Sequence, residues 1–494
     1  MLTSCNSDLK KPTRAMFAIP NSLAPRCPPI NKLPPELLIS IFRLIIDGQP
    51  RGLLDDNTLE TLPIYPDIFS HVCSRWRQTT LEFPTFWIGI QLSLSASTWK
   101  WFLARAKLFV SRTCQLPLDV YVDDNLQETV HEIDNTNFLF NIATRIRSLW
   151  FSTRSRPHPE HNNVLQTIFL NCTPGTLTEV TLLDVADFYP LTFIQAFDNR
   201  PYGSNNIILS VADNDLDSLW LSVTSLRVGG IYPRWSSKAY HGLVELHLLA
   251  WSNDPPTISV AELTSVLKSS PGLRILHIDL LVTEAELFSS DTPVRLEHLE
   301  ILNLGGTEYD DIEPLIRVIA PGPKALEFSF SDSDSPLERL SSNPEVVKFF
   351  QRSNIERLHV NYGRYTLFED AFRLAPRLQV MALEYLELVG PSLHESGVGV
   401  GNFCAPETLH TIYILQCHST QENFRKLAQL FPTQTLIVWR CNLIPAPMGS
   451  DHSNSNPILS ISGVQREWDS IFSSRFKVIV SDEPSPIKGW GHML

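Results

Sequence analysis

The stretch Leu273-Arg-Ile-Leu-His-Ile278 carries the pattern that decides the fold. Apolar residues stand at its first, fourth and sixth positions, so its last three residues alternate with the period of two typical of a half-buried β-strand. The same apolar-x-x-apolar-x-apolar pattern recurs at residues 146–151, 177–182, 223–228, 243–248, 299–304, 355–360, 378–383 and 409–414. So many similar segments predict an internal repeat that begins near residue 145.

The spacing of these segments indicates the size of the repeat. Successive central apolar residues are 30, 26, 23 and 31 positions apart, measured from Leu246 to Leu276 to Leu302 and from Leu358 to Met381 to Ile412. Between strands, residues 260–268, 311–319 and 422–430 have helical periodicity. A strand and a helix in each unit of about 20 to 29 residues resemble leucine-rich repeats.

This resemblance implies an α/β solenoid, or horseshoe, over residues 146–480, in which each unit buries its apolar face against the next. Two features depart from the family pattern: residues 183–222 interrupt the period, and the Asn that usually follows the strand is mostly missing. An ordinary doubly wound α/β domain also alternates strands and helices and remains the alternative. In a solenoid, we expect substrate to meet the concave strand face. The candidate contacts are the residues expected to be exposed there, namely His247, Arg357, His359, Tyr413 and Trp439.

A second informative region lies near the N-terminus. Leu33-Pro-Pro-Glu-Leu-Leu-Ile-Ser-Ile-Phe42 is followed by Val72-Cys-Ser-Arg-Trp-Arg77 and by Pro84-Thr-Phe-Trp87. The first stretch has apolar residues at helical spacing, a proline at its start and Glu36 in its first turn, where the helix dipole favours negative charge. A second amphipathic segment begins near Asp67. By periodicity alone, these helices are also compatible with the first helical layer of a larger core.

The ordered combination of these motifs resembles an F-box over residues 31–92, as in F-box families where this small all-helical module precedes irregular leucine-rich repeats. The resemblance implies binding to a Skp-type adaptor and, through it, to a cullin. The inferred adaptor contacts are Leu33, Pro34, Glu36, Leu37, Leu38, Ile41, Phe42, Val72, Cys73, Trp76 and Trp87. One departure is the gap of 30 positions from Phe42 to Val72, which is longer than is usual in the family. Residues 48–66 read as an inserted surface loop that either projects harmlessly or obstructs the adaptor.

The remaining segments complete the expected organisation. Residues 1–30 and 481–494 read as N-terminal and C-terminal tails. Residues 93–145 read as linking helices, because Trp99, Phe102, Leu103, Ala106 and Phe109 follow a helical period. The expected fold class is therefore α/β, with a small helical module followed by a leucine-rich-repeat-like solenoid.

Composition restricts the class of partner. The chain has 494 residues, of which 43% are hydrophobic and 19% charged, as expected of an ordered chain with a large core. Its net charge of −13 argues against binding to nucleic acid. Its eight cysteines form no Cys-x-x-Cys pair, and no apolar run is long enough for a signal peptide or a membrane span. We therefore expect a cytoplasmic or nuclear protein that does not bind membranes.

Signals of catalysis are weak. His158-Pro-Glu-His161 lacks the helical context of a metal-binding HExxH motif and is expected to be a solvated surface turn. We expect no cofactor, no metal and no enzymatic activity; a hydrolase or transferase on an α/β scaffold would need a deep pocket with converging polar residues. Two interpretations remain: the substrate receptor of an SCF-type (Skp, cullin, F-box) ubiquitin ligase, or a leucine-rich-repeat interaction scaffold without a ligase role.

Overall fold

A computed structural model describes residues 29–49, 65–95, 98–124, 136–154, 158–185, 192–197, 206–250, 257–283, 292–305, 312–331, 343–361, 367–385, 406–420, 424–425, 427, 435–443, 476–479 and 487. The chain divides into two compact units. The first contains residues 1–51 and 55–86, and the second contains residues 52–54 and 87–494.

Helices make up the described elements of the first unit: the 3₁₀ helix η2 (Pro29–Lys32), α1 (Pro35–Asp47), α2 (Asp67–Val72), α3 (Ser74–Glu82) and the start of the 3₁₀ helix η4 (Pro84–Trp87). Helix α1 begins at Pro35, whose missing N–H costs nothing there, and the amide of Gly48 closes its last turn on the carbonyl of Leu44. The extended backbone of Cys73 separates α2 from α3, and its Sγ accepts a hydrogen bond from the amide of Trp76.

Aromatic side chains form the core of the first unit. The ring of Phe42 stacks on Phe69 at a centroid distance of 4.1 Å and meets Trp76 edge-on at 4.8 Å. Phe86 lies 6.2 Å from Phe42 on another side, and Leu38, one turn earlier on α1, is fully buried. This cluster joins α1 to α2 and α3, so a short helical module has a core of its own.

The second unit contains a large parallel sheet whose strands pair in chain order. Its fourteen described strands are β1 (Gly89–Ser93), β2 (Leu118–Asp124), β3 (Ile146–Thr153), β4 (Glu179–Asp184), β7 (Ser225–Gly229), β9 (Glu245–Leu249), β11 (Ile275–Ile278), β14 (Ile301–Leu304), β16 (Leu326–Ser331), β17 (Ile355–Asn361), β18 (Val380–Glu384), β19 (Thr411–Leu415), β21 (Thr435–Trp439) and β23 (Phe476–Ile479). A doubly wound sheet reverses its strand order at a switch point. The described strands have no such reversal, so that alternative does not fit.

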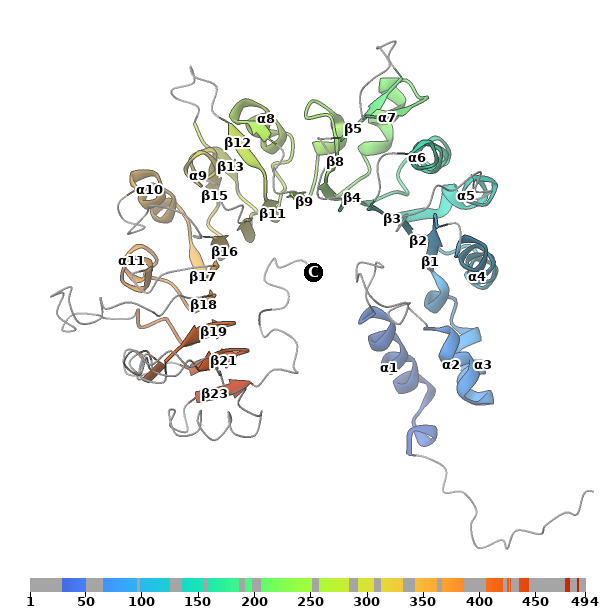
Figure 1. Cartoon of the computed structure of the whole chain (residues 1–494), viewed down its shortest axis with the longest axis horizontal. Coiled ribbons are helices and arrows are strands. Elements are labelled where there is room, and N and C mark those ends of the chain that lie inside the picture. The colour runs from blue at the N-terminus through green and yellow to red at the C-terminus, as the bar shows by residue number, and fades with distance from the viewer. Residues whose placement is uncertain are drawn as a thin grey trace, which may run out of the picture. The chain divides into compact units, whose positions relative to one another are not determined.

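Helices lie along one side of this sheet (Figure 1). They are α4 (Trp99–Arg112), α5 (Thr136–Ile142), α6 (Pro159–Asn171), α7 (Asp213–Trp220), α8 (Val260–Lys268), α9 (Glu313–Val318), α10 (Pro344–Arg352) and α11 (Leu367–Leu374). In helix α8, Ser259 and Glu262 form a capping box at the N-terminus, and Leu263 and Leu267 on one face are buried.

The register of the strands aligns equivalent residues of successive repeats. Leu246 of β9 pairs with Leu276 of β11, which pairs with Leu302 of β14, and all three are fully buried. The residues that follow β18, β19 and β21 also match, because Tyr385, Gln416 and Arg440 all have a positive φ of 50–52°. The second unit is thus mixed α/β, and its backbone geometry recurs from one repeat to the next.

The nine strands expected from the repeat pattern are all present. The sequence missed β1, β2, β16, β21 and β23, and the expectation that residues 93–145 are only linking helices is wrong. Helices α4 and α5 form there, but β2 lies between them and pairs with β1 and β3. The alternation in Leu118-Asp-Val-Tyr-Val122 was the available signal, and the stronger helical period of residues 99–110 obscured it.

The period breaks at residues 183–222, and a second, smaller sheet forms from this stretch together with residues 231–233. Strands β5 (Thr192–Ala196), β6 (Ile207–Leu209) and β8 (Ile231–Pro233) form a separate three-stranded sheet in the order β6-β5-β8. Residues 1–28 of the expected N-terminal tail lie outside the described residues, and so do residues 50–64 of the expected insert. In the expected C-terminal tail the structure describes Ile487, which is buried and not part of a loose tail.

Candidate functional site

Helix α1 carries an apolar stripe on each of two faces. Leu38 and Phe42 face the core, whereas Leu37, Ile41, Leu44 and Ile45 recur at i, i+4, i+7 and i+8 on another face. Leu37 is 52% exposed and Leu44 72% exposed. A helix of a self-contained module keeps polar residues on its solvent side, so the outer apolar stripe of α1 requires an explanation.

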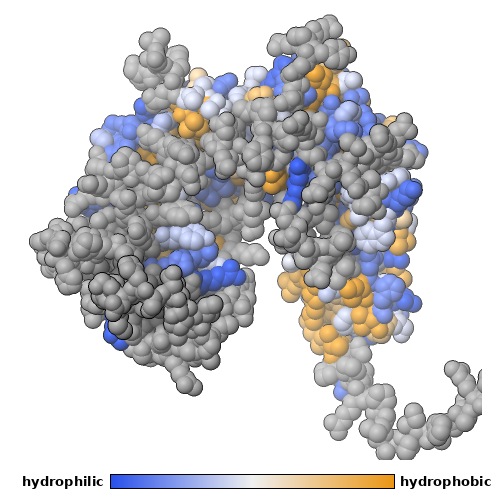
Figure 2. All heavy atoms as spheres, viewed as in Figure 1, coloured by the Kyte–Doolittle hydropathy of each residue, from blue (hydrophilic) through white to orange (hydrophobic). Residues whose placement is uncertain are grey.

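Other exposed apolar side chains belong to the same unit. Ile68 and Val72 lie one turn apart on α2, and Val72 is 53% exposed. The space-filling view shows hydrophobic side chains gathered over α1 and its neighbour α2 (Figure 2). We call Leu37, Ile41, Leu44, Ile45, Ile68 and Val72 the outer apolar residues of the first unit. Concentrations of this kind mark interaction sites on soluble proteins.

Hydrogen bonds between helices fix this arrangement. The guanidinium of Arg75 on α3 donates to the carbonyl of Leu33, just before α1. Nε of Arg77 donates to the carbonyl of Ser70 at 2.7 Å, which ties α3 to α2. The amide of Tyr65 donates to the side-chain carbonyl of Gln49 at 3.2 Å. This bond joins Gln49 and Tyr65, the described residues on either side of residues 50–64.

The inferred adaptor contacts fall into two groups. Pro34, Glu36, Leu37 and Val72 are exposed, and Leu33, Ile41, Cys73 and Trp76 are half-buried. Leu38, Phe42 and Trp87 are fully buried, so as surface contacts they were wrongly assigned. Leu38 and Phe42 lie on the core side of α1. Trp87 belongs to the second unit, where its ring meets Phe109 edge-on at 4.9 Å and Arg112 lies over it at 4.1 Å.

The second candidate surface is the strand face of the second unit that points away from the helices. Side chains alternate between the two faces of a strand, and the register aligns one central residue of each strand. We call these residues the central row; between β7 and β21 they are Arg227, His247, His277, Asn303, Ser329, His359, Ala382, Tyr413 and Ile437. The row is polar from Arg227 to His359 and apolar from Ala382 onward.

Three of the five expected substrate contacts are not surface residues. His247, His359 and Trp439 are buried, whereas Tyr413 is half-buried and the Arg357 side chain is 44% exposed. Arg357 reaches Glu327 on the neighbouring strand, with Nη1 3.1 Å from Oε2. Burial nevertheless dominates at Glu327 and raises the pKa of its carboxyl to about 7.

His247 and His277 lie on adjacent strands with ring centroids 5.8 Å apart. His247 is 3% exposed, and within the part of the chain that the structure describes neither of its ring nitrogens has a hydrogen-bond partner. Burial lowers the pKa of His247 to about 2, and the positive charge of Arg227 acts in the same direction. His247 is therefore neutral at physiological pH.

His359 joins two strands through polar contacts. Its Nδ1 lies 2.8 Å from Oγ of Ser329, and its Nε2 lies 3.3 Å from Oε2 of Glu384. This connectivity is that of a hydrolase triad, and sequence analysis missed Ser329 and Glu384. Ser329 lies within β16, which pairs with β14 on one side and β17 on the other. The backbone amides near Ser329 therefore donate to the neighbouring strands of the sheet. Within these strands they cannot form an oxyanion hole beside Ser329.

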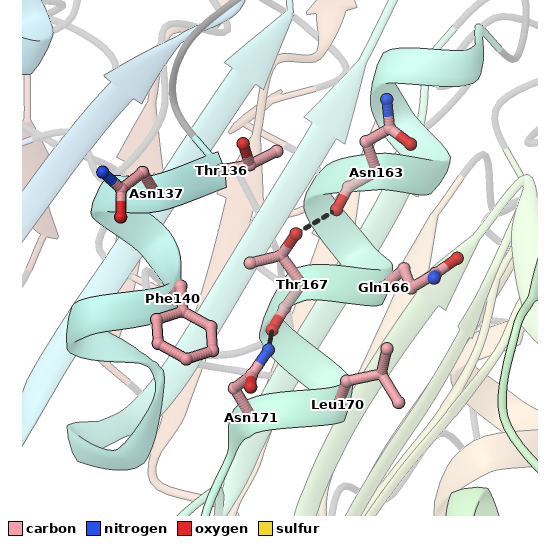
Figure 3. A pocket seen from close by; sticks show the side chains of 8 residues that line it. All are labelled: Thr136, Asn137, Phe140, Asn163, Gln166, Thr167, Leu170 and Asn171. Atoms are coloured by element: carbon pink, nitrogen blue, oxygen red, sulfur yellow. Dashed lines mark hydrogen bonds between the residues drawn. The ribbon is translucent and has the colours of Figure 1, made fainter.

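A hollow of about 370 Å³ lies between α5 and α6 on the helical side of the second unit. Figure 3 shows its lining by amide and hydroxyl side chains together with Phe140 and Leu170. The hydroxyl of Thr167 donates to the carbonyl of Asn163 at 2.6 Å, and the amide of Asn171 donates to the carbonyl of Thr167 at 2.7 Å. These polar groups are satisfied by their own helix and do not converge on a common point as in an active site.

The motif of His158 and His161 differs from its expected form. The surface-turn interpretation is wrong, because α6 starts at Pro159 with His158 as its cap. His161 is buried, and its Nε2 lies 2.6 Å from Oδ2 of Asp124. Among the described residues no three His, Cys, Asp or Glu side chains form a metal-binding group. Within the same residues, every helix is too short or too polar to cross a membrane.

No protein-family model matches the chain, and no curated protein matches it.

Proposed function

We propose that the chain is the substrate-recognition subunit of an SCF-type ubiquitin ligase. In this proposal the first unit is an F-box module that binds a Skp-type adaptor and, through it, a cullin. The second unit is a leucine-rich-repeat-like solenoid that binds a protein substrate. The chain itself is not an enzyme, since transfer of ubiquitin is carried out by other subunits in such ligases.

One observation carries the proposal: Leu37, Leu44, Ile68 and Val72 of the first unit remain exposed although Leu38 and Phe42 of the same unit are fully buried. Leu37 and Leu44 therefore lie outside the packed interior, and half-buried Ile41 lies between them on the same stripe. Burial of apolar surface drives most protein association, and an amphipathic helix that presents i, i+4 and i+7 anchors suits a helical partner or groove. Of these residues, Leu37 and Ile41 are among the adaptor contacts expected from the F-box resemblance.

Two features of the second unit support the solenoid part of the proposal. Strands pair in chain order with helices on one side (Figure 1), and left-handed residues recur after β18, β19 and β21. Each strand and helix then contacts mainly its neighbours in the sequence, as in repeat proteins. Extended strand faces of this kind are common surfaces for protein partners.

The alternative is an interaction scaffold whose first unit binds no ligase. The two functions are distinguished by a pull-down of the purified full chain with a Skp-type adaptor, beside the double variant Leu37→Asp, Ile41→Asp. The matched control is Leu108→Asp, Leu170→Asp, which changes two exposed leucines on α4 and α6 of the second unit.

We expect the unmodified chain and the control to retain the adaptor and the double variant to lose it, with circular dichroism spectra unchanged. No retention by the unmodified chain would favour the scaffold. Equal retention by all three proteins would show that the outer stripe of α1 is not the docking surface.

A further inference from the structure

The strand face of the second unit ends in an apolar patch that already has an occupant. Ala382, Leu415, Trp439 and Ile487 form one buried cluster, with Val380 and Tyr413 packed against it. The strand residues come from β18, β19 and β21, which are neighbours in the sheet. Ile487 lies 48 positions beyond Trp439 in the sequence and is only 2% exposed. A residue of the C-terminal region is thus seated on the strand face.

The side chains beneath Ile487 form a surface with a defined shape. Ala382 is aligned with Tyr413 across β18 and β19, and Leu415 is aligned with Trp439 across β19 and β21. The guanidinium of Arg440 lies over the indole of Trp439 at 4.5 Å and holds that ring. We call Val380, Ala382, Tyr413, Leu415 and Trp439 the apolar strand patch.

The patch differs from the rest of the strand face. At the equivalent positions of the central row, the preceding strands carry His277, Asn303, Ser329 and His359. Side chains on this face are not needed to pack against the helices, because those helices lie on the other side of the sheet (Figure 1). The buried residue Ile487, which covers the patch, indicates the chemistry that fits it.

We infer that the apolar strand patch binds a peptide segment of the substrate through a branched aliphatic side chain, and that Ile487 occupies the same place when substrate is absent. This inference rests on the proposed function, since it names the class of substrate that the second unit recognises. An occupant from the same chain competes at high effective concentration. Substrate then binds only to the fraction of molecules in which Ile487 has left the patch.

The test measures binding of a fluorescein-labelled synthetic peptide with the sequence Glu-Pro-Ser-Pro-Ile-Lys-Gly-Trp, which is that of residues 483–490. Fluorescence anisotropy compares the full unmodified chain with Ile487→Asp. We expect the variant to bind the peptide at least about tenfold more tightly, the change that results when the patch is free in about one molecule in ten before substitution. A peptide with Asp in place of Ile should bind neither protein.

Two further variants, each combined with Ile487→Asp, locate the binding. Tyr413→Asp changes a half-buried residue and Trp439→Ala a buried one, so the first remains informative if the second unfolds. Both should abolish the gain in peptide affinity produced by Ile487→Asp, whereas Leu170→Asp on α6 should leave that gain unchanged. Equal peptide binding by the unmodified chain and Ile487→Asp, or an unchanged affinity after Tyr413→Asp, would overturn the inference. Retention of a Skp-type adaptor by the same proteins is measured in parallel. If the adaptor is not retained but the peptide binds as expected, the result counts only against the proposed ligase role.

Discussion

Nε2 of His161 lies 2.6 Å from Oδ2 of Asp124, and the two side chains are only 1% and 0% exposed. His161 belongs to α6, and Asp124 ends β2. The contact therefore joins a helix to a strand that lies 37 positions away in the sequence. In a buried setting a hydrogen bond of this kind stabilises strongly only while both partners are present.

Substitution His161→Ala should destabilise the second unit by about 1–3 kcal/mol, because it removes the hydrogen bond between the imidazole and the buried carboxyl group of Asp124, which keeps only weaker contacts such as that from Oγ1 of Thr153. Urea unfolding followed by tryptophan fluorescence measures the change. His241→Ala alters an exposed histidine and should change the free energy of unfolding by less than about 0.5 kcal/mol. Similar midpoints for the two variants would show that the pair contributes little.

The two apolar stripes of α1 should respond differently to truncation. Phe42→Ala removes the ring that stacks on Phe69 and should destabilise the first unit by about 3–5 kcal/mol. Leu37→Ala removes an exposed side chain and should cost less than about 0.5 kcal/mol. Hydrogen exchange of the amides of α1 to α3 in the full chain reports the stability of this unit. Equal protection in the two variants would contradict the division of α1 into a core side and an outer side.

Glu327 should make the protein less stable as the pH rises. Its folded-state pKa of about 7 lies above its ordinary value of 4.5. The neutral form is thus favoured by folding, and this stability is fully present below pH 4.5 and lost as the pH rises through 7. Glu327→Gln should raise the melting temperature more at pH 8 than at pH 5, since one pKa unit corresponds to about 1.4 kcal/mol. Exposed Glu407→Gln is the control; the same pH-independent shift for both variants would argue against this role.

His247 should have the opposite pH dependence. Its folded-state pKa of about 2 lies below its ordinary value of 6.5. The buried ring stays neutral, so the stability it contributes is present above pH 6.5 and lost as the pH falls below that value. His247→Leu removes this proton linkage and the buried ring nitrogens, and it should raise the melting temperature more at pH 5 than at pH 8. A smaller gain at pH 5 than at pH 8 would exclude a buried neutral histidine at this position.

Much of the secondary structure could be predicted from local patterns. Leu246 and Leu248, with a polar residue between them, predict β9, and the capping residues Ser259 and Glu262 predict the start of α8. The helical period of α1 was equally clear, but periodicity did not tell which of its two apolar stripes faces the core. The F-box resemblance implied that Leu38 and Phe42 contact the adaptor together with Leu37, although of these three only Leu37 is exposed.

The strand face was harder to predict than the strands themselves. His359 and Trp439 occupy positions that alternate with core residues, which is why they were expected to be exposed. His359 is instead buried between Ser329 and Glu384 on neighbouring strands, and Trp439 is buried in a cluster with Ile487. Each of these partners is between 25 and 48 positions away, so the residues around His359 and Trp439 contain no signal of their burial.

The sequence by itself determined where many of the strands and helices form, because the periods of two and 3.6 residues act over a few neighbouring positions. It also placed the apolar residues of α1 at positions that resemble those of an F-box. Only the tertiary structure decided that the strands pair in chain order, that His161 meets Asp124 and that Ile487 covers the apolar strand patch. The physical reason is that burial and pairing depend on contacts between segments far apart in the chain, which local periodicity does not encode.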